Sequence, residues 1–104
     1  MATEQYHEPA SELTQETRTF ARMITSLIEE AEAINWYEQR ISVEQDAGAK
    51  AIMENAQKEE FKHFSMDLEF LLRKKSEWRI MVATVVGKSG DIVKNGEKGE
   101  DKID

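Results

Sequence analysis

The sequence predicts an all-α fold in which two long helices form an antiparallel hairpin and a shorter third helix follows. Apolar residues recur at spacings of three and four along two long stretches, as in helices with one buried face. A short polar segment, residues 42–48, separates the stretches and has the length of a connection between antiparallel helices. One hairpin covers only part of each apolar face, so we expect two copies to complete a four-helix bundle.

The first long helix is expected from about Glu12 to about Val43. Pro9, the single proline, precedes it, and Ser11 or Thr14 can cap its first turn with a side-chain oxygen. Its apolar face consists of Leu13, Phe20, Ile24, Leu27, Ala31, Ile34 and Ile41.

The second long helix is expected over residues 47–75 and the third over residues 77–86, with Ser76 as the cap of the third. Basic residues at 73–75 suit the negative end of the second helix. The apolar faces consist of Ala49, Ile52, Met53, Ala56, Phe64, Leu68 and Leu71 on the second helix, and of Trp78, Met81, Val82 and Val85 on the third.

Composition divides the chain into three parts. Residues 1–10 form a polar lead-in, residues 11–86 the hairpin with its short third helix, and residues 87–104 a tail. Four of the five glycines lie at or after position 87, among many charged residues, which is typical of a flexible segment. We expect both the lead-in and the tail to be flexible.

Charge and composition exclude several classes of protein. The 104 residues carry a net charge of −7, which argues against a nucleic-acid binder and suits a protein that attracts cations. The absence of cysteine excludes disulfides, thiolate metal sites and iron–sulfur clusters. No stretch approaches the roughly 20 apolar residues of a membrane span. Residues 1–7 lack the apolar core of a signal peptide, so a cytoplasmic location is expected.

Three polar side chains fall on the predicted apolar faces. Glu30 lies near the middle of the first face, and Glu60 and His63 are neighbours, three residues apart, on the second. A buried carboxylate is normally paired, protonated or bound to metal, because burying a bare charge is unfavourable. A Glu-x-x-His pair inside a helix bundle is the ligand pattern of carboxylate-bridged di-iron proteins.

Two copies of the chain supply the ligands that such a site needs. Di-iron bundles use about four carboxylates and two imidazoles, and two chains offer Glu30, Glu60 and His63 twice. The count predicts a metal site between two subunits, on a two-fold axis. Oxygen and nitrogen ligands favour iron or manganese, with zinc as a competitor, and calcium or zinc can occupy such sites in a crystal.

Simpler interpretations of these residues stay open. Glu60 and His63 can form a surface pair, and Glu30 can be an interfacial salt-bridge partner of Arg40 or Lys62 in another chain.

The neighbouring residues are equally open to two interpretations. Glu29 and Glu32 form either a solvated acidic face or a site that collects cations. Trp36 and Tyr37 are either packing residues or neighbours of the metal, and Tyr37 shares the face of Glu30. Asp67 also faces the apolar stripe, one turn beyond His63.

Two sequence blocks resemble the encapsulated ferritins, the ferritin-like cargo proteins of encapsulin nanocompartments. The first block is Ile28-Glu29-Glu30-Ala31-Glu32-Ala33-Ile34-Asn35-Trp36-Tyr37-Glu38-Gln39-Arg40, and the second is Glu59-Glu60-x-x-His63 followed by Met66-x-Leu68-Glu69. The resemblance covers about residues 7–86 and includes His7-Glu8-Pro9.

The resemblance implies a half-ferritin that is active only when paired, with dimers assembled into a ring-shaped decamer inside an encapsulin shell, its expected partner. It implies oxidation of Fe(II) by oxygen and iron storage by the shell. Carried over by position, the iron ligands would be Glu30, Glu60 and His63, with Tyr37 nearby, and the outer site through which metal enters would be Glu29 and Glu32 beside Trp36.

The tail departs from this family pattern. Family members end in a short targeting peptide with a Gly-Ser-Leu-like core, and residues 92–104 lack an obvious one. The sequence favours a ferroxidase, with a rubrerythrin-like peroxide reductase and a non-catalytic metal-binding assembly module as the alternatives.

Overall fold

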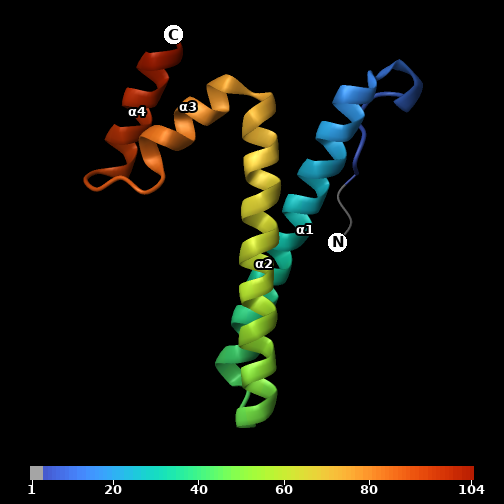
Figure 1. Cartoon of the computed structure of the whole chain (residues 1–104), viewed down its shortest axis with the longest axis vertical. Helices are drawn as coiled ribbons and strands as arrows, with labels where there is room; N and C mark the ends of the chain where they lie inside the picture. The colour runs from blue at the N-terminus through green and yellow to red at the C-terminus, as the bar shows by residue number, and fades with distance from the viewer. Residues whose placement is uncertain (1–3) are drawn as a thin grey trace. The chain divides into compact units, whose positions relative to one another are not determined.

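The computed structural model describes residues 4–104, which contain four α-helices, one short 3-10 helix and no strand (Figure 1). The elements are η1 (Ala10–Glu12), α1 (Gln15–Val43), α2 (Ala47–Lys74), α3 (Ser76–Val85) and α4 (Ile92–Ile103). The predicted all-α class, with a long helix hairpin and a short third helix, is confirmed. The predicted lead-in includes residues 1–3, which lie outside the described residues.

The chain divides into two compact units, and the division falls inside α2 rather than at the expected boundary after residue 86. We call Met1–Glu69 the hairpin unit and Phe70–Asp104 the C-terminal unit.

The hairpin unit begins its helices with side-chain caps. The Thr14 hydroxyl accepts a hydrogen bond from the Thr17 N–H at 3.1 Å, so Thr14 is the cap of α1, and Ser11 belongs to η1 instead. The Asp46 carboxylate accepts from the Ala49 N–H at 2.8 Å in the first turn of α2. Both bonds satisfy backbone donors that have no partner within the helix.

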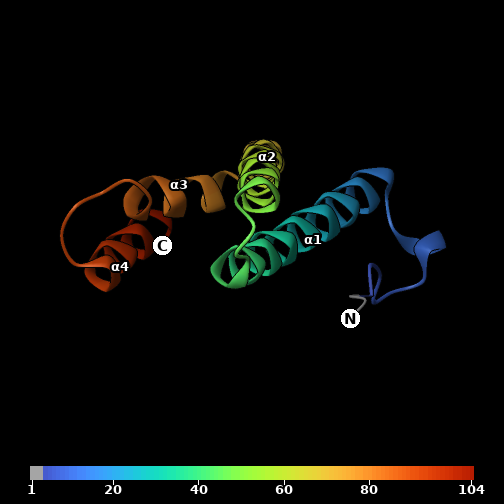
Figure 2. The ribbon, with the colours of Figure 1, turned by 90° about the horizontal axis from the view of Figure 1, so that it is seen from below.

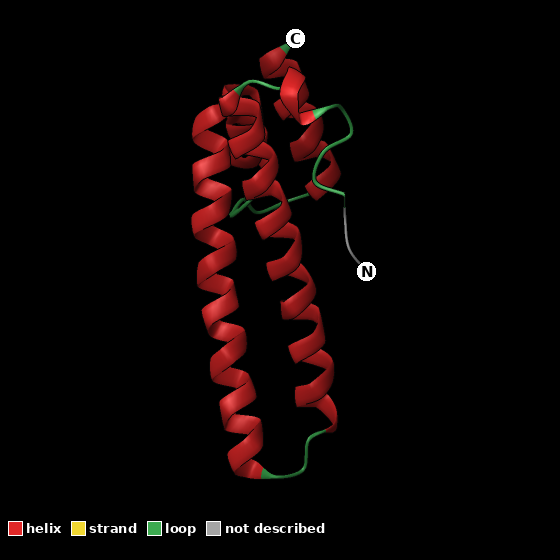
Figure 3. Ribbon diagram, turned by 90° about the vertical axis from the view of Figure 1, so that its right-hand side faces the viewer, coloured by secondary structure: helices red, strands yellow, loops and turns green. Residues whose placement is uncertain are grey.

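The loop between α1 and α2 consists of residues 44–46 only, so the two helices run antiparallel from it (Figures 1 and 3). Gln57 of α2 ties the helices together, because its side-chain amide donates to the Ile34 carbonyl at 3.2 Å and to Glu38 Oε1 at 3.0 Å. In Figure 1 the helices diverge toward the N-terminal end of α1.

No residue among 4–69 is fully buried, whereas Leu71 and Leu72 of the C-terminal unit are. Several apolar side chains of the hairpin unit face solvent. Ile52 is 72% exposed and Met66 is 56% exposed. They lie on one stripe of α2 with a spacing of four, three, four and three, formed by Ile52, Ala56, Glu59, His63 and Met66, which we call the outer stripe.

The C-terminal unit contains a second, shorter helix hairpin, in which α3 and α4 lie side by side (Figures 1 and 2). Gly87 and Gly90 make the turn between them with φ of 76° and 95°, conformations that glycine adopts without steric cost. The Asp91 carboxylate caps α4 by accepting from the Lys94 N–H at 2.9 Å.

Two expectations for this unit are wrong. The cap position of α3 is Lys75, whose side chain does not cap the helix, and Ser76 is already the first helical residue. The expected flexible tail, residues 87–104, is a turn followed by helix α4. The helix is held by close packing, because Gly99 is buried against the side chains of Met81 and Thr84.

Within residues 4–104, none of the helices combines the length and the apolar character that crossing a bilayer requires.

Candidate metal-binding site

Glu60 and His63 form a pair on one turn of α2. His63 Nδ1 lies 2.9 Å from Glu60 Oε1, within hydrogen-bonding distance. The helical spacing of three brings the side chains together, as the sequence predicts. The Glu60 side chain is 22% exposed and that of His63 46% exposed, so His63 lies nearer to solvent. Because His63 belongs to the outer stripe, the pair can be reached from outside the chain through His63.

Glu30 of α1 is half-buried and faces Asp67 of α2. One carboxylate oxygen of each residue, Glu30 Oε2 and Asp67 Oδ2, is buried without a hydrogen-bond partner. Two carboxylates offer only acceptors to each other, so they share a hydrogen bond only when one of them carries a proton. Unpartnered buried oxygens are costly, and each such group in a folded chain calls for a proton, a water or a cation.

The electrostatics of Glu30 reflect this position. Its pKa is raised from 4.5 to about 7, most of all by burial and then by the hydrogen bond and the charge of Asp67. The charge of His63 acts in the opposite direction and that of Glu60 adds to the rise, both more weakly. The field at Glu30 therefore comes from the three other side chains of the candidate site.

The described part of a single chain does not form a complete metal site. Within residues 4–104, no three carboxylate or imidazole side chains come close enough to hold one metal ion. The four candidate groups fall into two pairs, Glu60 with His63 and Glu30 with Asp67. Their donor atoms are oxygen and nitrogen, which suit iron and manganese.

The other predicted site residues lie on α1, around Glu30. Glu29 is exposed and Glu32 half-buried. Trp36 is 47% exposed. With Gln39 and Arg40 it lines a shallow surface hollow.

Tyr37 and the candidate salt-bridge cations have partners within the chain. The half-buried Tyr37 packs under Arg40, whose guanidinium carbon lies 5.4 Å from the ring centroid. Lys62 Nζ lies 2.7 Å from Glu59 Oε2, and this ion pair lowers the pKa of Glu59. The sequence pointed to Asp67 as a residue on the apolar stripe but not to its contact with Glu30, which depends on how the two helices align.

The matches to known proteins decide the family. A family model described as EncFtn-like matches residues 5–89, most of the chain. The chain belongs to the EncFtn-like family. The predicted resemblance to encapsulated ferritins is thereby confirmed.

Two curated relatives agree with this EncFtn-like assignment. A "Ferritin-like protein" of Thermotoga maritima is 45% identical over 75 residues, which are 72% of this chain and 66% of the relative. An "Encapsulated ferritin-like protein" of Rhodospirillum rubrum is 37% identical over 86 residues, 83% of this chain and 61% of the relative. The EncFtn-like chain thus spans less than two thirds of the length of these relatives.

A solved structure shows the same fold. The crystal structure of a protein from Nitrosomonas europaea superposes on the EncFtn-like chain with a TM-score of 0.82 and 35% sequence identity. The match covers 86% of this chain and 99% of the other. The helix hairpin is therefore the half-ferritin fold that the sequence predicts.

Proposed function

We propose that two copies of the chain form a ferroxidase, which oxidises Fe(II) to Fe(III) with oxygen at a site between the subunits. The observation that carries the proposal is that Glu30 of α1 lies close enough to the Glu60–His63 pair of α2 for their charges to act on it. These three side chains would be half of a di-iron ligand set. Membership of the EncFtn-like family supports iron as the metal.

The side chains present fit iron as the substrate. Glu30 has a buried carboxylate oxygen without a partner, which a cation would satisfy. Glu60 and His63 supply oxygen and nitrogen donors, and the chain has no cysteine to favour a softer metal. Two chains together offer the four carboxylates and two imidazoles that ferritin-like di-iron sites use.

The outer stripe of α2 supports the pairing of two copies. Its two large apolar side chains, those of Ile52 and Met66, are largely exposed in one chain, and His63 lies between them in the sequence. A second copy packed along this stripe would bury both side chains and bring its own Glu60–His63 pair to the first.

The chemistry requires two Fe(II) ions held close together. Each Fe(II) gives up one electron, so two ions and two protons reduce one O₂ to H₂O₂, and four ions with four protons reduce it to two waters. The carboxylates of Glu30 and Glu60 stabilise Fe(III) over Fe(II), because the higher charge gains more from anionic ligands. Tyr37 would lie beside the site.

The acidic residues Glu29 and Glu32 are proposed to guide Fe(II) toward the site, next to Trp36. Glu29 is exposed, so it can attract cations from solvent. We also propose that the paired chains build a ring, the decamer of the encapsulated ferritins. The name of the Rhodospirillum rubrum relative supports an encapsulin shell as the partner that stores the oxidised iron, in the cytoplasm.

An anaerobic Fe(II) titration of metal-free protein tests the proposal, with the molecular mass followed by light scattering, before exposure to air. We expect saturation near one iron per chain in an assembled form, followed by fast oxidation in air. Glu30→Gln and His63→Ala should each lower iron occupancy and rate by tenfold or more. Glu54→Gln, an equal loss of charge at an exposed position of α2, is the matched control.

Three results would contradict the proposal. Absence of iron binding, or binding to a monomer without oxidation, would favour the non-catalytic assembly module. Normal oxidation by both site variants would place the iron elsewhere. Slow reaction with oxygen but fast turnover with peroxide and an electron donor would favour the rubrerythrin-like reductase.

A further inference from the structure

We infer that Asp67 is a further metal ligand, which shares a divalent cation with Glu30 of the same chain. The inference deepens the proposed function and rests on it. Glu30 and Asp67 come from the two facing helices of one hairpin, and each has a buried carboxylate oxygen with no hydrogen-bond partner. The two carboxylates also lie within hydrogen-bonding reach of each other, so one cation could satisfy both of these oxygens.

The register of α2 places Asp67 with the other ligands. Asp67 follows His63 by four residues and Glu60 by seven, so the three side chains share one face of the helix. The charges of all three act on Glu30, although in the described part of one chain no three of these groups come together. Asp67 is therefore the carboxylate of α2 that faces α1 of the same chain, next to the Glu60–His63 pair.

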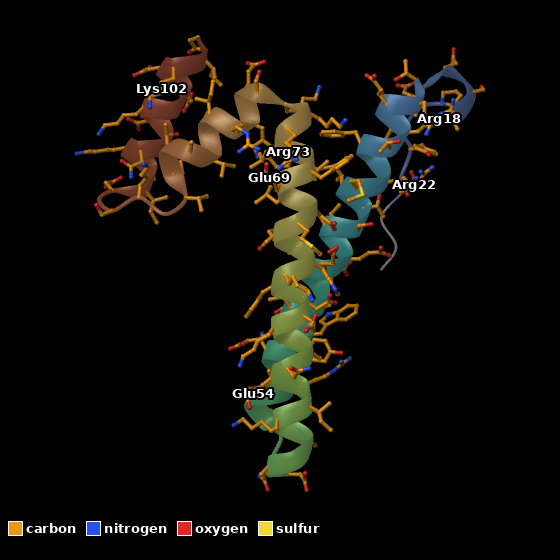
Figure 4. The ribbon with its side chains drawn as sticks, viewed as in Figure 1. Arg18, Arg22, Glu54, Glu69, Arg73 and Lys102 are labelled. Atoms are coloured by element: carbon orange, nitrogen blue, oxygen red, sulfur yellow. The ribbon has the colours of Figure 1, made fainter. Side chains whose placement is uncertain are left out.

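Among residues 4–104, no other group satisfies these two oxygens. No described donor, cationic or neutral, reaches Glu30 Oε2 or Asp67 Oδ2. Lys62 is paired with Glu59, and Arg40 lies over Tyr37. In Figure 4, Arg18 and Arg22 project from the N-terminal part of α1. Arg18 donates to the Leu13 carbonyl at 3.2 Å. No described cation of the same chain therefore partners the buried oxygen of Asp67.

The pairing has a consequence for the order of assembly. Because Glu30 and Asp67 belong to the same chain, they offer two oxygen ligands before a second copy arrives. A paired site would then contain six carboxylates rather than four, and the added negative charge would favour Fe(III) further.

Calorimetric titration with Mn(II) under chelator-free conditions tests the inference without relying on oxidation, because Mn(II) shares the oxygen and nitrogen preference of Fe(II). The informative variant is Asp67→Asn, which keeps the size of the side chain. Its amide can still donate a hydrogen bond to Glu30, so a residue that only positions Glu30 would be replaced without loss. A metal ligand would not be replaced in this way, because an amide is a much weaker ligand than a carboxylate. We therefore expect the Kd for Mn(II) to rise at least tenfold in Asp67→Asn.

Two companion variants sharpen the result. Asp67→Glu keeps a carboxylate and should retain more of the affinity than Asp67→Asn. Glu54→Gln removes the same charge at an exposed position about 20 Å along α2 and should leave the affinity unchanged. Metal-free Asp67→Asn should melt at a higher temperature than the parent, because the carboxylate that faces Glu30 is replaced by a donor.

A crystal structure of the Mn(II) form completes the test. We expect an oxygen of Asp67 in the coordination sphere of the metal. Unchanged Mn(II) affinity in Asp67→Asn, or an Asp67 carboxylate outside the coordination sphere, would overturn the inference while leaving the proposed function intact. A parent protein that binds no Mn(II) and no Fe(II) would instead overturn the proposed function.

Discussion

At the scale of single residues, the metal-free chain brings two carboxyl groups together without a cation between them. Burial and the neighbouring Asp67 raise the pKa of Glu30 to about 7. Near neutral pH the Glu30 side chain is therefore about half protonated, and its proton can form the hydrogen bond between the two carboxyl groups. The proton takes the place that we assign to a metal ion, so the two compete.

This proton makes the stability of the metal-free protein depend on pH. The folded pKa of Glu30 lies above the unfolded value of 4.5, so the folded chain binds the proton more tightly. The contribution of Glu30 is fully present below pH 4.5 and is lost as the pH rises through about 7. We expect the free energy of unfolding to fall by up to about 3 kcal/mol over this range.

Denaturant unfolding at several pH values, at fixed protein concentration and with a chelator present, measures this loss. In Glu30→Gln the side chain cannot titrate, so the same range of pH should show a smaller fall than in the parent. Equal slopes in the two proteins would show that Glu30 has an ordinary pKa in solution.

Much of the candidate site follows from local sequence, and one part does not. The contact between Glu60 and His63 depends only on helical spacing, and the place of Glu30 follows from the apolar pattern of its own helix. The contact between Glu30 and Asp67 depends on how far one helix slides along the other. Local pattern does not determine that register; the loop at residues 44–46 and the Gln57 hydrogen bonds do.

At the scale of elements, the packing of α4 on α3 depends on one small residue. A Cβ at position 99 would lie 2.8 Å from Met81 Sδ and would overlap the Thr84 hydroxyl. We expect Gly99→Ala to destabilise the C-terminal unit by about 1–3 kcal/mol, as overpacking does.

Gly96→Ala is the matched control for this effect, since a Cβ at position 96 would meet no atom within 4 Å. It should stabilise α4 by about 0.5–1 kcal/mol, because alanine favours helix over glycine. Helix content by circular dichroism and the melting temperature distinguish the two substitutions. If Gly99→Ala behaves like Gly96→Ala, the close contact between α3 and α4 does not exist in solution.

The two hairpins differ in how well the sequence reveals them. The long helices carry wide apolar stripes, so their period identifies them and their ends to within a few residues. Helix α4 is rich in glycine and charge, and its buried face contains Gly99 where a large apolar residue is usually expected. Glycine allows two helices to pack closely, but in the amino-acid composition the same glycine is taken as a sign of a flexible segment. The Asp91 cap was the local signal that marks its start.

At the scale of the whole molecule, the hairpin unit leaves much apolar surface in contact with solvent. Its described residues include no fully buried side chain, and the outer stripe exposes Ile52 and Met66. We expect the protein to associate through this stripe. Met66→Asp should shift it toward the monomer, since pairing would then bury a charge without a partner.

Sedimentation velocity at micromolar concentration, in metal-free buffer, detects the shift. Val43→Asp is the control, because Val43 is also largely exposed, at 76%, but lies at the end of α1 and is not part of the outer stripe of α2. An unchanged sedimentation coefficient for Met66→Asp, or an equal shift for both variants, would exclude the outer stripe as the contact.

The short loop at residues 44–46 sets how much chain each contact between α1 and α2 closes. The hydrogen bonds of Gln57 join residues 19 and 23 apart in the sequence. Glu30 and Asp67 lie farther from the loop, so their contact closes a longer segment and gains less support from it. A cation bound by both residues would join the two helices at this more distant level and would oppose local opening of the hairpin there.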